Sequence, residues 1–347
     1  MNRKNFLSSL GPLSLSLGTM GKFPLKDWIL PADPDSTPVG KVPPYLRQGD
    51  LIGITCPSGT LSFSDTLPAM RKLQEWGFTV STGSTVGVRD HTFAGSDEER
   101  AKDFQVMLDH PSIKAILLGR GGYGAIRIID RIDFTRFRQH PKWIIGFSDA
   151  TVFHSHINRR FSIPTIHSKM CNSFPEDWKA AEPLQKASIE SIRRCLLGEK
   201  MHYDTPPEKA NRHGMARGPL VGGNLSILES LAGSRSSLNT EGKILFVEDT
   251  EEYLYNIDRM LWNLKRSGKL DKITGLIVGG FTHIRPDDPG EEFGRSIQEI
   301  VMEKVKEFSF PVCFNFPVGH EKINYALKCG MRHELAVTEN SVILREI

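Results

Sequence analysis

The sequence predicts an α/β protein built on a parallel sheet, followed by a smaller region that is richer in strands. Three observations support this prediction. Apolar runs typical of buried strands alternate with segments of helical periodicity from about residue 43 onward. A polar stretch at residues 198–217, which contains Pro206-Pro207, separates two such regions. The length of 347 residues is itself too great for one small core.

The expected boundaries divide the chain into four parts. Residues 1–42 form a signal-like or unstructured segment, residues 43–197 a first domain, residues 198–217 a linker and residues 218–347 a second domain. The composition, 39% hydrophobic and 24% charged, is typical of a soluble globular protein. A net charge of +3 with no basic patch among aromatic residues gives no reason to expect a nucleic-acid partner.

The cysteines and the N-terminal segment bear on cofactors and location. The five cysteines are far apart and form no Cys-x-x-Cys pair, so we expect neither a zinc site nor a disulfide framework. The basic start Asn2–Leu7 and the Ser/Gly/Leu-rich stretch Leu7–Gly21 resemble a weak export signal of twin-arginine type, with Lys4 in place of the second arginine. This predicts a periplasmic or otherwise exported protein, and the alternative is an unstructured tail on a cytoplasmic one. No other segment approaches 18 consecutive apolar residues, so stable membrane insertion is not expected.

The first domain is expected to alternate strands and helices. In chain order the expected elements are the strand Leu51–Cys56, a helix from Leu67 to Trp76 that Gly77 ends, a helix from Ala101 to Leu108 behind the capping box of Ser96 and Glu99, the strand Ala115–Leu118, a helix through Ile128 and Ile132, and the strands Trp143–Gly146 and Ile163–Ile166. This alternation implies a parallel sheet with helices on both faces. Ligands of such sheets bind beyond the carboxyl ends of the strands.

The second domain continues with similar signals. Its expected elements are a loop passing into a helix at Gly222–Leu228, the strand Lys243–Val247, a helix through Ile257 and Leu264, and the strands Ile273–Phe281 and Pro311–Val318. The last two runs are mostly apolar, which is typical of buried strands.

A glycine-rich loop, Gly119–Gly124, follows the strand Ala115–Leu118. Its spacing is not that of a dinucleotide fingerprint, and no acidic ribose ligand is clearly placed. We interpret it as a loop whose backbone amides at Gly121 and Gly122 approach a reacting carbonyl closely, which only glycine permits. A tight turn without function is the alternative.

Ser148 lies where the strand Trp143–Gly146 turns into a helix. Gly146 and Ala150 stand two positions on either side, which is the layout of a nucleophile elbow with Ala at the last position. Such a turn exposes the hydroxyl beside the amides of a helix N-terminus. The simpler alternative is an ordinary helix N-cap, because serine is common there.

A serine nucleophile needs a base and an orienting acid. Glu248 and Asp249 follow a buried strand, and the residues alone leave the choice between them open. His320 follows Gly319 at the end of another apolar run, whereas His154 and His156 are two apart on a helix and make a poor metal pair. The order serine, acid, histidine is that of the α/β-hydrolases, so the residues predict a serine hydrolase without a metal or cofactor.

Six ordered motifs resemble those of the LD-carboxypeptidases, a serine peptidase family that also holds the microcin C immunity peptidases. The resemblance runs from about Pro43 to the C-terminus. The motifs are Gly119-Arg-Gly-Gly-Tyr-Gly-Ala125, Ile145-Gly-Phe-Ser-Asp149, Gly222-Gly-Asn-Leu225, Phe246-Val-Glu-Asp249, Tyr255-Asn-Ile-Asp-Arg259 and Phe316-Pro-Val-Gly-His320.

The resemblance implies a flavodoxin-like first domain, a smaller β-rich α+β second domain and a homodimer. It implies that Ser148 is the nucleophile, Glu248 the triad acid and His320 the base, with the backbone amides of Gly122 and Asp149 as the oxyanion hole. The implied substrate is a murein tetrapeptide, from which the terminal D-alanine is removed at an L,D bond. The further candidates for substrate contacts are Gly121, Tyr123, Asn224 and Lys169.

One departure from the family bears on specificity. This chain has His167-Ser-Lys-Met170 where many members have His-Gly-Pro-Met. Lys169 is a candidate contact for a substrate carboxylate, with a solvated surface lysine as the alternative. Two other functions remain open: a peptidase or amidase acting on a peptide–nucleotide antibiotic, and a peptide-binding protein without catalysis.

Overall fold

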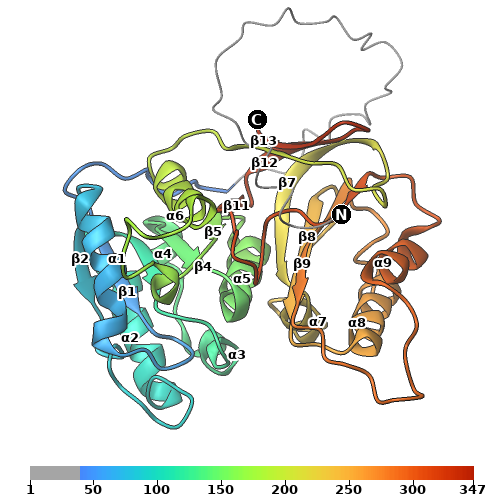
Figure 1. Cartoon of the computed structure of the whole chain (residues 1–347). Helices are drawn as coiled ribbons and strands as arrows, with labels where there is room; N and C mark the ends of the chain where they lie inside the picture. The colour runs from blue at the N-terminus through green and yellow to red at the C-terminus, as the bar shows by residue number, and fades with distance from the viewer. Residues whose placement is uncertain (1–39) are drawn as a thin grey trace, which may run out of the picture. The chain divides into compact units, whose positions relative to one another are not determined.

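The structure, a computed structural model, describes residues 40–347. The expected export signal, residues 2–21, lies outside the described residues, as does nearly all of the segment 1–42. The described part contains two sheets, each covered by helices (Figure 1).

The first sheet has six strands in the order β11-β5-β4-β3-β1-β2. All neighbouring pairs are parallel except β11 with β5, which are antiparallel. The prediction of a parallel sheet is therefore confirmed. The strands are β1 (Leu51–Thr55), β2 (Thr79–Thr82), β3 (Ile113–Leu118), β4 (Trp143–Gly146), β5 (Thr165–His167) and β11 (Leu327–Cys329).

Helices pack on both faces of this sheet because its strands bury residues on both sides. In β3, Ala115 and Leu117 belong to one hydrophobic cluster, and Ile116 and Leu118 belong to another. The helices are α1 (Phe63–Glu75), α2 (Asp97–Asp109), α3 (Ala125–Ile128), α4 (Thr135–Gln139), α5 (Thr151–Phe161) and α6 (Pro183–Leu196). The predicted capping box of Ser96 and Glu99 does begin α2.

The second sheet has seven strands in the order β10-β9-β8-β7-β12-β13-β6. The pairs among β7, β8, β9 and β10 are parallel, and those joining β7, β12, β13 and β6 are antiparallel. Its strands are β6 (His202–Thr205), β7 (Gly214–Asn224), β8 (Ile244–Thr250), β9 (Gly275–Thr282), β10 (Val312–Cys313), β12 (Arg332–Val337) and β13 (Val342–Glu346). The helices of this region are α7 (Leu225–Ser230), α8 (Leu254–Arg266) and α9 (Ile297–Val305).

The structure differs from the predicted linker, residues 198–217. This stretch contains β6 and the beginning of β7, both of which pair with other strands of the second sheet. Tyr203 is buried, stacks on Tyr325 and donates to the carbonyl of Ala326 at 2.6 Å. The polar composition therefore belongs to strands with one exposed face, and only short segments of it connect elements.

Two smaller predictions in the second region are wrong. Pro311–Val318 is not a continuous strand, because only Val312–Cys313 pairs with β9 and Asn315 then turns at φ 55°. Gly222–Asn224 is the end of β7 and not a loop, with the helix starting at Leu225. In both places the apolar or glycine pattern indicated burial correctly but not the backbone geometry.

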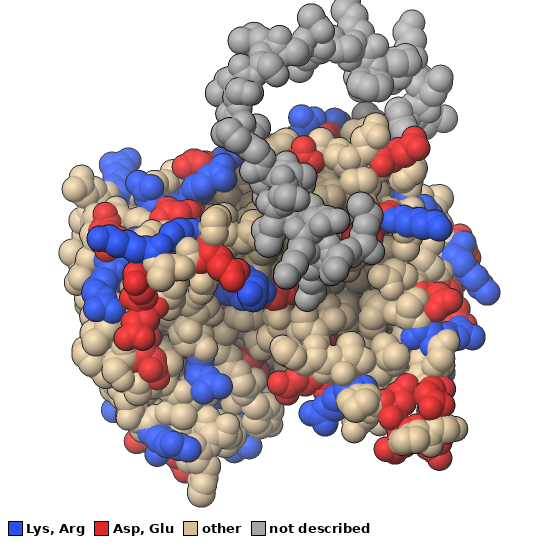
Figure 2. Space-filling model, in the orientation of Figure 1, with Lys and Arg blue, Asp and Glu red and all other residues tan. Residues whose placement is uncertain are grey.

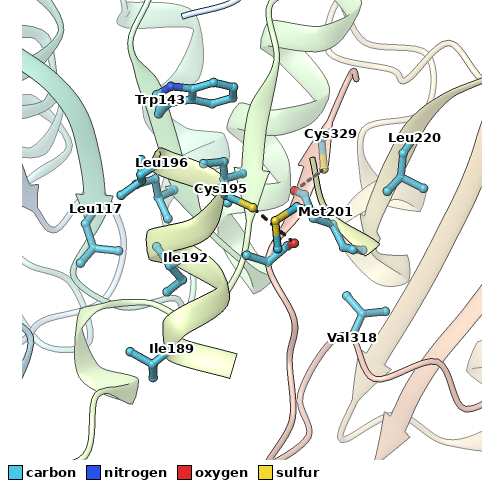
Figure 3. Packing of buried hydrophobic residues seen from close by; sticks show 14 of the residues in the cluster. Leu117, Trp143, Ile189, Ile192, Cys195, Leu196, Met201, Leu220, Val318 and Cys329 are labelled. Atoms are coloured by element: carbon cyan, nitrogen blue, oxygen red, sulfur yellow. Dashed lines mark hydrogen bonds between the residues drawn. The ribbon is translucent and has the colours of Figure 1, made fainter. Parts of the chain in front are cut away.

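One hydrophobic cluster contains residues from both halves of the sequence. Figure 3 shows side chains of α6, among them Ile192 and Leu196, between Leu117 of the first sheet and Val318 of the second region.

The five cysteines are buried and free. None of the helices within residues 40–347 has the length and apolar character needed to cross a bilayer. On the face shown in Figure 2, acidic and basic side chains are interspersed, in keeping with 44 basic and 41 acidic residues in the chain.

Candidate active site

Ser148 occupies a strained turn at the carboxyl end of β4. Its φ is 61°, a left-handed conformation that is uncommon for non-glycine residues. A 3-10 turn, Ser148–Ala150, then leads into α5. A Cβ built on Gly121 would lie 3.1 Å from the Ser148 Oγ, so the glycine-rich loop approaches the hydroxyl closely. The structure thus gives Ser148 the geometry of a nucleophile elbow.

The carboxylate of Asp149 holds the glycine-rich loop against this elbow. It accepts hydrogen bonds from Ser58 Oγ at 2.5 Å and from the backbone N–H of Ala125 at 2.7 Å. Burial raises the pKa of Asp149, while these bonds and the charge of Arg100 act in the opposite direction. Gly122, in the glycine-rich loop, has φ 100°. Within residues 40–347 its N–H donates to no backbone or side-chain acceptor.

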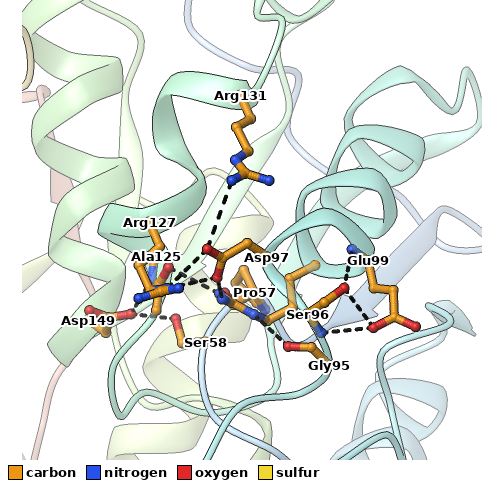
Figure 4. A network of polar contacts seen from close by, with 12 residues as sticks. Pro57, Ser58, Gly95, Ser96, Asp97, Glu99, Ala125, Arg127, Arg131 and Asp149 are labelled. Carbon is orange, nitrogen blue, oxygen red and sulfur yellow. Dashed lines mark hydrogen bonds and ion pairs between the residues drawn. The ribbon is translucent and has the colours of Figure 1, made fainter. Parts of the chain in front are cut away.

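A buried guanidinium joins the loops around this site. The side chain of Arg100 is fully buried and donates to the carbonyl oxygens of Pro57 at 2.6 Å, Gly124 at 3.0 Å and Gly95 at 3.1 Å. It is also paired with Asp97 one helical turn away, and Figure 4 shows Asp97, Pro57 and Gly95 gathered in this network. These carbonyls belong to three separate loops, so one side chain fixes their relative positions.

Glu248 and His320 are joined by a hydrogen bond. Nδ1 of His320 lies 2.7 Å from Oε2 of Glu248, which is fully buried on β8. Burial alone would raise the pKa of Glu248, but its close approach to His167 and His320, together with their charges, lowers this pKa to about 2. The carboxylate is therefore ionised at neutral pH. A Cβ on Gly319 (φ 110°) would lie 2.6 Å from Glu248 Oε2, so only glycine permits this approach.

Asp249, the alternative acid, points elsewhere because successive residues of a strand face opposite sides. Its carboxylate accepts from Asn224 Nδ2 and from the backbone N–H groups of Ser226 and Thr250, each at 2.8 Å. Burial, followed by the neighbouring charge of Glu248, raises the pKa of Asp249 to about 6. Asp249 thus organises the start of α7, and the geometry selects Glu248 as the partner of the histidine.

The ring of His320 reaches the elbow from the second region. Its centroid lies 4.8 Å from that of Phe147, the residue before Ser148. No hydrogen bond joins Ser148 to His320 in the part of the chain that the structure describes. Hydrogen bonds of this kind are often long in unliganded sites and shorten when substrate binds. The structure therefore brings serine, histidine and glutamate into one neighbourhood, with the Glu248–His320 bond already formed.

The candidate substrate contacts differ in how they are used. Lys169 is not a solvated surface lysine, because it is partly buried and its Nζ donates to the carbonyl of Glu321 at 2.5 Å. Burial lowers the pKa of Lys169, and its Nζ lies 5.4 Å from the Phe147 ring. Tyr123 is half exposed and packs on Phe93. The side chain of Asn224 is already engaged, because it caps α7 and donates to Asp249.

Sequence reasoning missed three residues of this neighbourhood. Arg100 resembled an ordinary charged residue of a helix, and only its spacing to Asp97 gave a signal. Ser58 stands three residues after the end of β1, at the sheet edge where ligands bind, and that position could have been noticed. His167 ends β5 at the same edge and was noticed only as part of a motif.

Comparison with known proteins now defines the class. Residues 52–168 match the LD-carboxypeptidase N-terminal domain, and residues 217–335 match the LD-carboxypeptidase C-terminal domain. The chain is 31% identical to the "Probable murein peptide carboxypeptidase" of Bacillus subtilis over 87% of this chain and 93% of that protein. It is 30% identical to the murein tetrapeptide carboxypeptidase of Pseudomonas aeruginosa, over 80% and 91% of the two chains.

The chain therefore belongs to the LD-carboxypeptidase family of hydrolases. The crystal structure of muramoyltetrapeptide carboxypeptidase from Oxalobacter formigenes superposes with a TM-score of 0.76 at 28% identity, covering 85% of this chain and 98% of that one. This chain is 25% identical to the microcin C7 self-immunity protein MccF of Escherichia coli, over 87% of this chain and 94% of the MccF chain. The family resemblance expected from the six motifs is confirmed.

Proposed function

We propose that this protein is a serine carboxypeptidase that cleaves the L,D peptide bond of murein tetrapeptides and releases the terminal D-alanine. The observation that carries this proposal is the bond between His320 Nδ1 and the ionised, fully buried Glu248, beside a serine in a strained elbow. The names of the relatives from Bacillus subtilis and Pseudomonas aeruginosa support the murein substrate.

The first half of the reaction forms an acyl-enzyme. The Ser148 hydroxyl attacks the carbonyl carbon of the L,D bond, and its proton passes to Nε2 of His320. The N–H groups of Gly122 and Asp149 donate to the oxyanion that forms. The imidazolium then gives the proton to the amine of D-alanine, the C–N bond breaks, and the peptide remains as an ester on Ser148.

The second half repeats the same steps with water. His320 accepts a proton from the attacking water, the ester carbon again becomes tetrahedral, and the proton returns to Ser148 as the ester bond breaks. Throughout both halves, Glu248 accepts from Nδ1–H of His320, keeps Nε2 directed at the reaction and stabilises the imidazolium. No step in this scheme uses a metal or cofactor.

A carboxypeptidase must recognise a free carboxylate, and Lys169 is the cation best placed to do so. Its position next to Phe147 puts a charge close to the elbow, and partial burial strengthens its attraction for an anion. A cavity of about 520 Å³ opens beside it, lined by polar groups that include Asn172, Ser173 and Lys322. We assign this cavity to the substrate. Gly121 and Tyr123 would contact the substrate close to Ser148.

The similarity to MccF supports a second candidate substrate, a peptide–nucleotide antibiotic. The lower identity, 25% against 30% and 31% for the relatives named for murein, places this candidate second. A binding protein without catalysis is the remaining alternative, and it predicts no turnover of either substrate.

Turnover of matched substrates tests these alternatives. The protein is incubated with a disaccharide tetrapeptide, a disaccharide pentapeptide ending in D-Ala-D-Ala, and an aminoacyl sulfamoyl adenosine, each with and without EDTA. We expect D-alanine release from the tetrapeptide alone and no effect of EDTA. Cleavage of the nucleotide conjugate alone would favour the second candidate, and loss of activity in EDTA would contradict the metal-free scheme.

Two further proposals concern location and assembly. We propose export through the signal-like segment at residues 2–21. Cell fractionation tests this proposal, and a product found only in the cytoplasm with Met1 retained would reject it.

We also propose a homodimer, as the family resemblance implies. Light scattering on the purified chain of 38.9 kDa should then give twice that mass, and the monomer mass would contradict the proposal.

A further inference from the structure

A second histidine faces the triad acid. His167 is the last residue of β5, and its side chain is completely buried. Neither Nδ1 nor Nε2 of this ring has a hydrogen-bond partner within the described residues, and the same is true of Oε1 of Glu248. Buried polar atoms of this kind are rare in folded proteins because each loses its hydration without compensation.

These unpartnered atoms lie opposite one another. Nε2 of His167 is 3.8 Å from Oε1 of Glu248, while the other carboxylate oxygen, Oε2, is bonded to His320. Closing the gap by roughly 0.6 Å would bring it within hydrogen-bond range. A carboxylate oxygen accepts and an imidazole N–H donates, so the pair is complementary.

The surroundings of His167 hold its ring in this orientation. Its centroid lies 5.0 Å from that of Phe246, in an edge-on contact, and 6.0 Å from that of Phe147. In the register of the first sheet His167 is paired with Gly146, two residues before Ser148. The ring thus lies between the strand that carries the nucleophile and the strand that carries the acid.

We propose that His167 is a positioning residue for the triad: its Nε2–H donates to Oε1 of Glu248, so that the carboxylate is held between two histidines and presents Oε2 to His320. The inference rests on the proposed serine mechanism. A carboxylate that accepts from one histidine only can rotate about its terminal torsion, which has a broad energy profile. With both oxygens bonded, the direction of the Glu248–His320 bond, and hence of His320 Nε2, is fixed.

Three substitutions separate positioning from packing. In His167→Gln the amide nitrogen can occupy the place of Nε2 and still donate to Glu248. In His167→Asn the shorter amide places its nitrogen near the former Nδ1, and His167→Leu has no donor. His333→Gln is the matched control, because His333 is a buried histidine of the second sheet that contacts the carbonyl of Met331 and not the triad.

The measurement is kcat and KM for D-alanine release from the disaccharide tetrapeptide, together with the melting temperature of each variant. We expect His167→Asn and His167→Leu to lose roughly 10- to 100-fold in kcat, the range typical of partners that orient a functional ligand, with little change in KM. His167→Gln should stay within about threefold of the unmodified enzyme, although all three lower the melting temperature.

Two outcomes would overturn the inference. Wild-type kcat in both His167→Asn and His167→Leu would show that the contact does not matter, and an equal loss in His167→Gln and His167→Leu would show a packing role only. If His167→Leu does not fold, the comparison of Gln with Asn still decides. A parallel Ser148→Ala variant separates this failure from that of the mechanism, because activity surviving there would contradict the triad itself.

Discussion

At the level of single residues, the proposed chemistry depends on Glu248 staying ionised away from water. An unpaired buried carboxylate would take up a proton, because burial penalises the charged form. Here the contacts with His320 and His167 outweigh that penalty and keep the pKa of Glu248 at about 2. The contacts with His320 and His167 therefore offset the desolvation cost of the buried Glu248 carboxylate.

Replacing Glu248 by Gln should retain the fold and lower kcat by about 10³- to 10⁴-fold, because the amide no longer fixes the tautomer of His320 or stabilises the imidazolium. Steady-state D-alanine release measures this, with the circular dichroism spectrum as the control for folding. A loss of less than tenfold would show that another group orients the histidine.

The low pKa of Glu248 also predicts how stability depends on pH. Its folded-state pKa of about 2 lies below the ordinary value of 4.5, so its contribution is complete above pH 4.5 and is lost as pH falls toward 2. The difference in unfolding free energy between the wild type and Glu248→Gln should therefore shrink by about 3 kcal/mol over that window. Urea denaturation at a series of pH values checks this, and a constant difference would contradict it.

Gly319 permits the approach of the histidine loop to the acid. Gly319→Ala should lower kcat by at least about 100-fold, because its Cβ would meet the Glu248 carboxylate at 2.6 Å and displace His320. Gly233→Ala is the matched control: Gly233 also has a left-handed φ, 77°, but open space around it. The control should lose about 1 kcal/mol of stability and no activity. Equal activity in the two variants would refute the account.

At the level of elements, Arg100 joins the loops at the carboxyl ends of β1 and β3 and the loop that precedes α2. Arg100→Met should remove the guanidinium hydrogen bonds to three carbonyl oxygens and lower the unfolding free energy by at least about 2 kcal/mol. It should also reduce kcat, since the glycine-rich loop carries the proposed oxyanion donor Gly122.

Arg100→Lys is the control for this prediction. It keeps the charge but cannot bond three carbonyls at once, so it should fall between the wild type and Arg100→Met in melting temperature and kcat. A Met variant with wild-type stability would show that the network is not needed to hold the loops.

The sequence predicts much of this assembly where the signals are local. Continuous apolar runs such as Trp143–Gly146 indicated buried parallel strands, and the serine between two small residues indicated the elbow. The choice of Glu248 over Asp249 needed either the family motifs or the structure, because it depends on which face of β8 each side chain occupies. The partners of His167 and Arg100 come from distant segments and leave no local signal.

At the level of the whole molecule, the two halves of the sequence are not independent. Strand β11, from the second half, pairs antiparallel with β5 at the edge of the first sheet, and α6 packs on residues of both halves. Such long-range pairings could not be predicted from periodicity, which reports burial but not partners. They also explain why the proposed nucleophile in the first region lies near the proposed base and acid from the second.

The central claim is that Ser148 is the nucleophile that Glu248 and His320 activate. The most direct test is the rate of D-alanine release from the disaccharide tetrapeptide by the wild type and by Ser148→Ala, with matched melting temperatures as evidence of folding. The account predicts release by the wild type and a loss of roughly 10⁴-fold or more in the variant. Turnover by Ser148→Ala within tenfold of the wild type would contradict it.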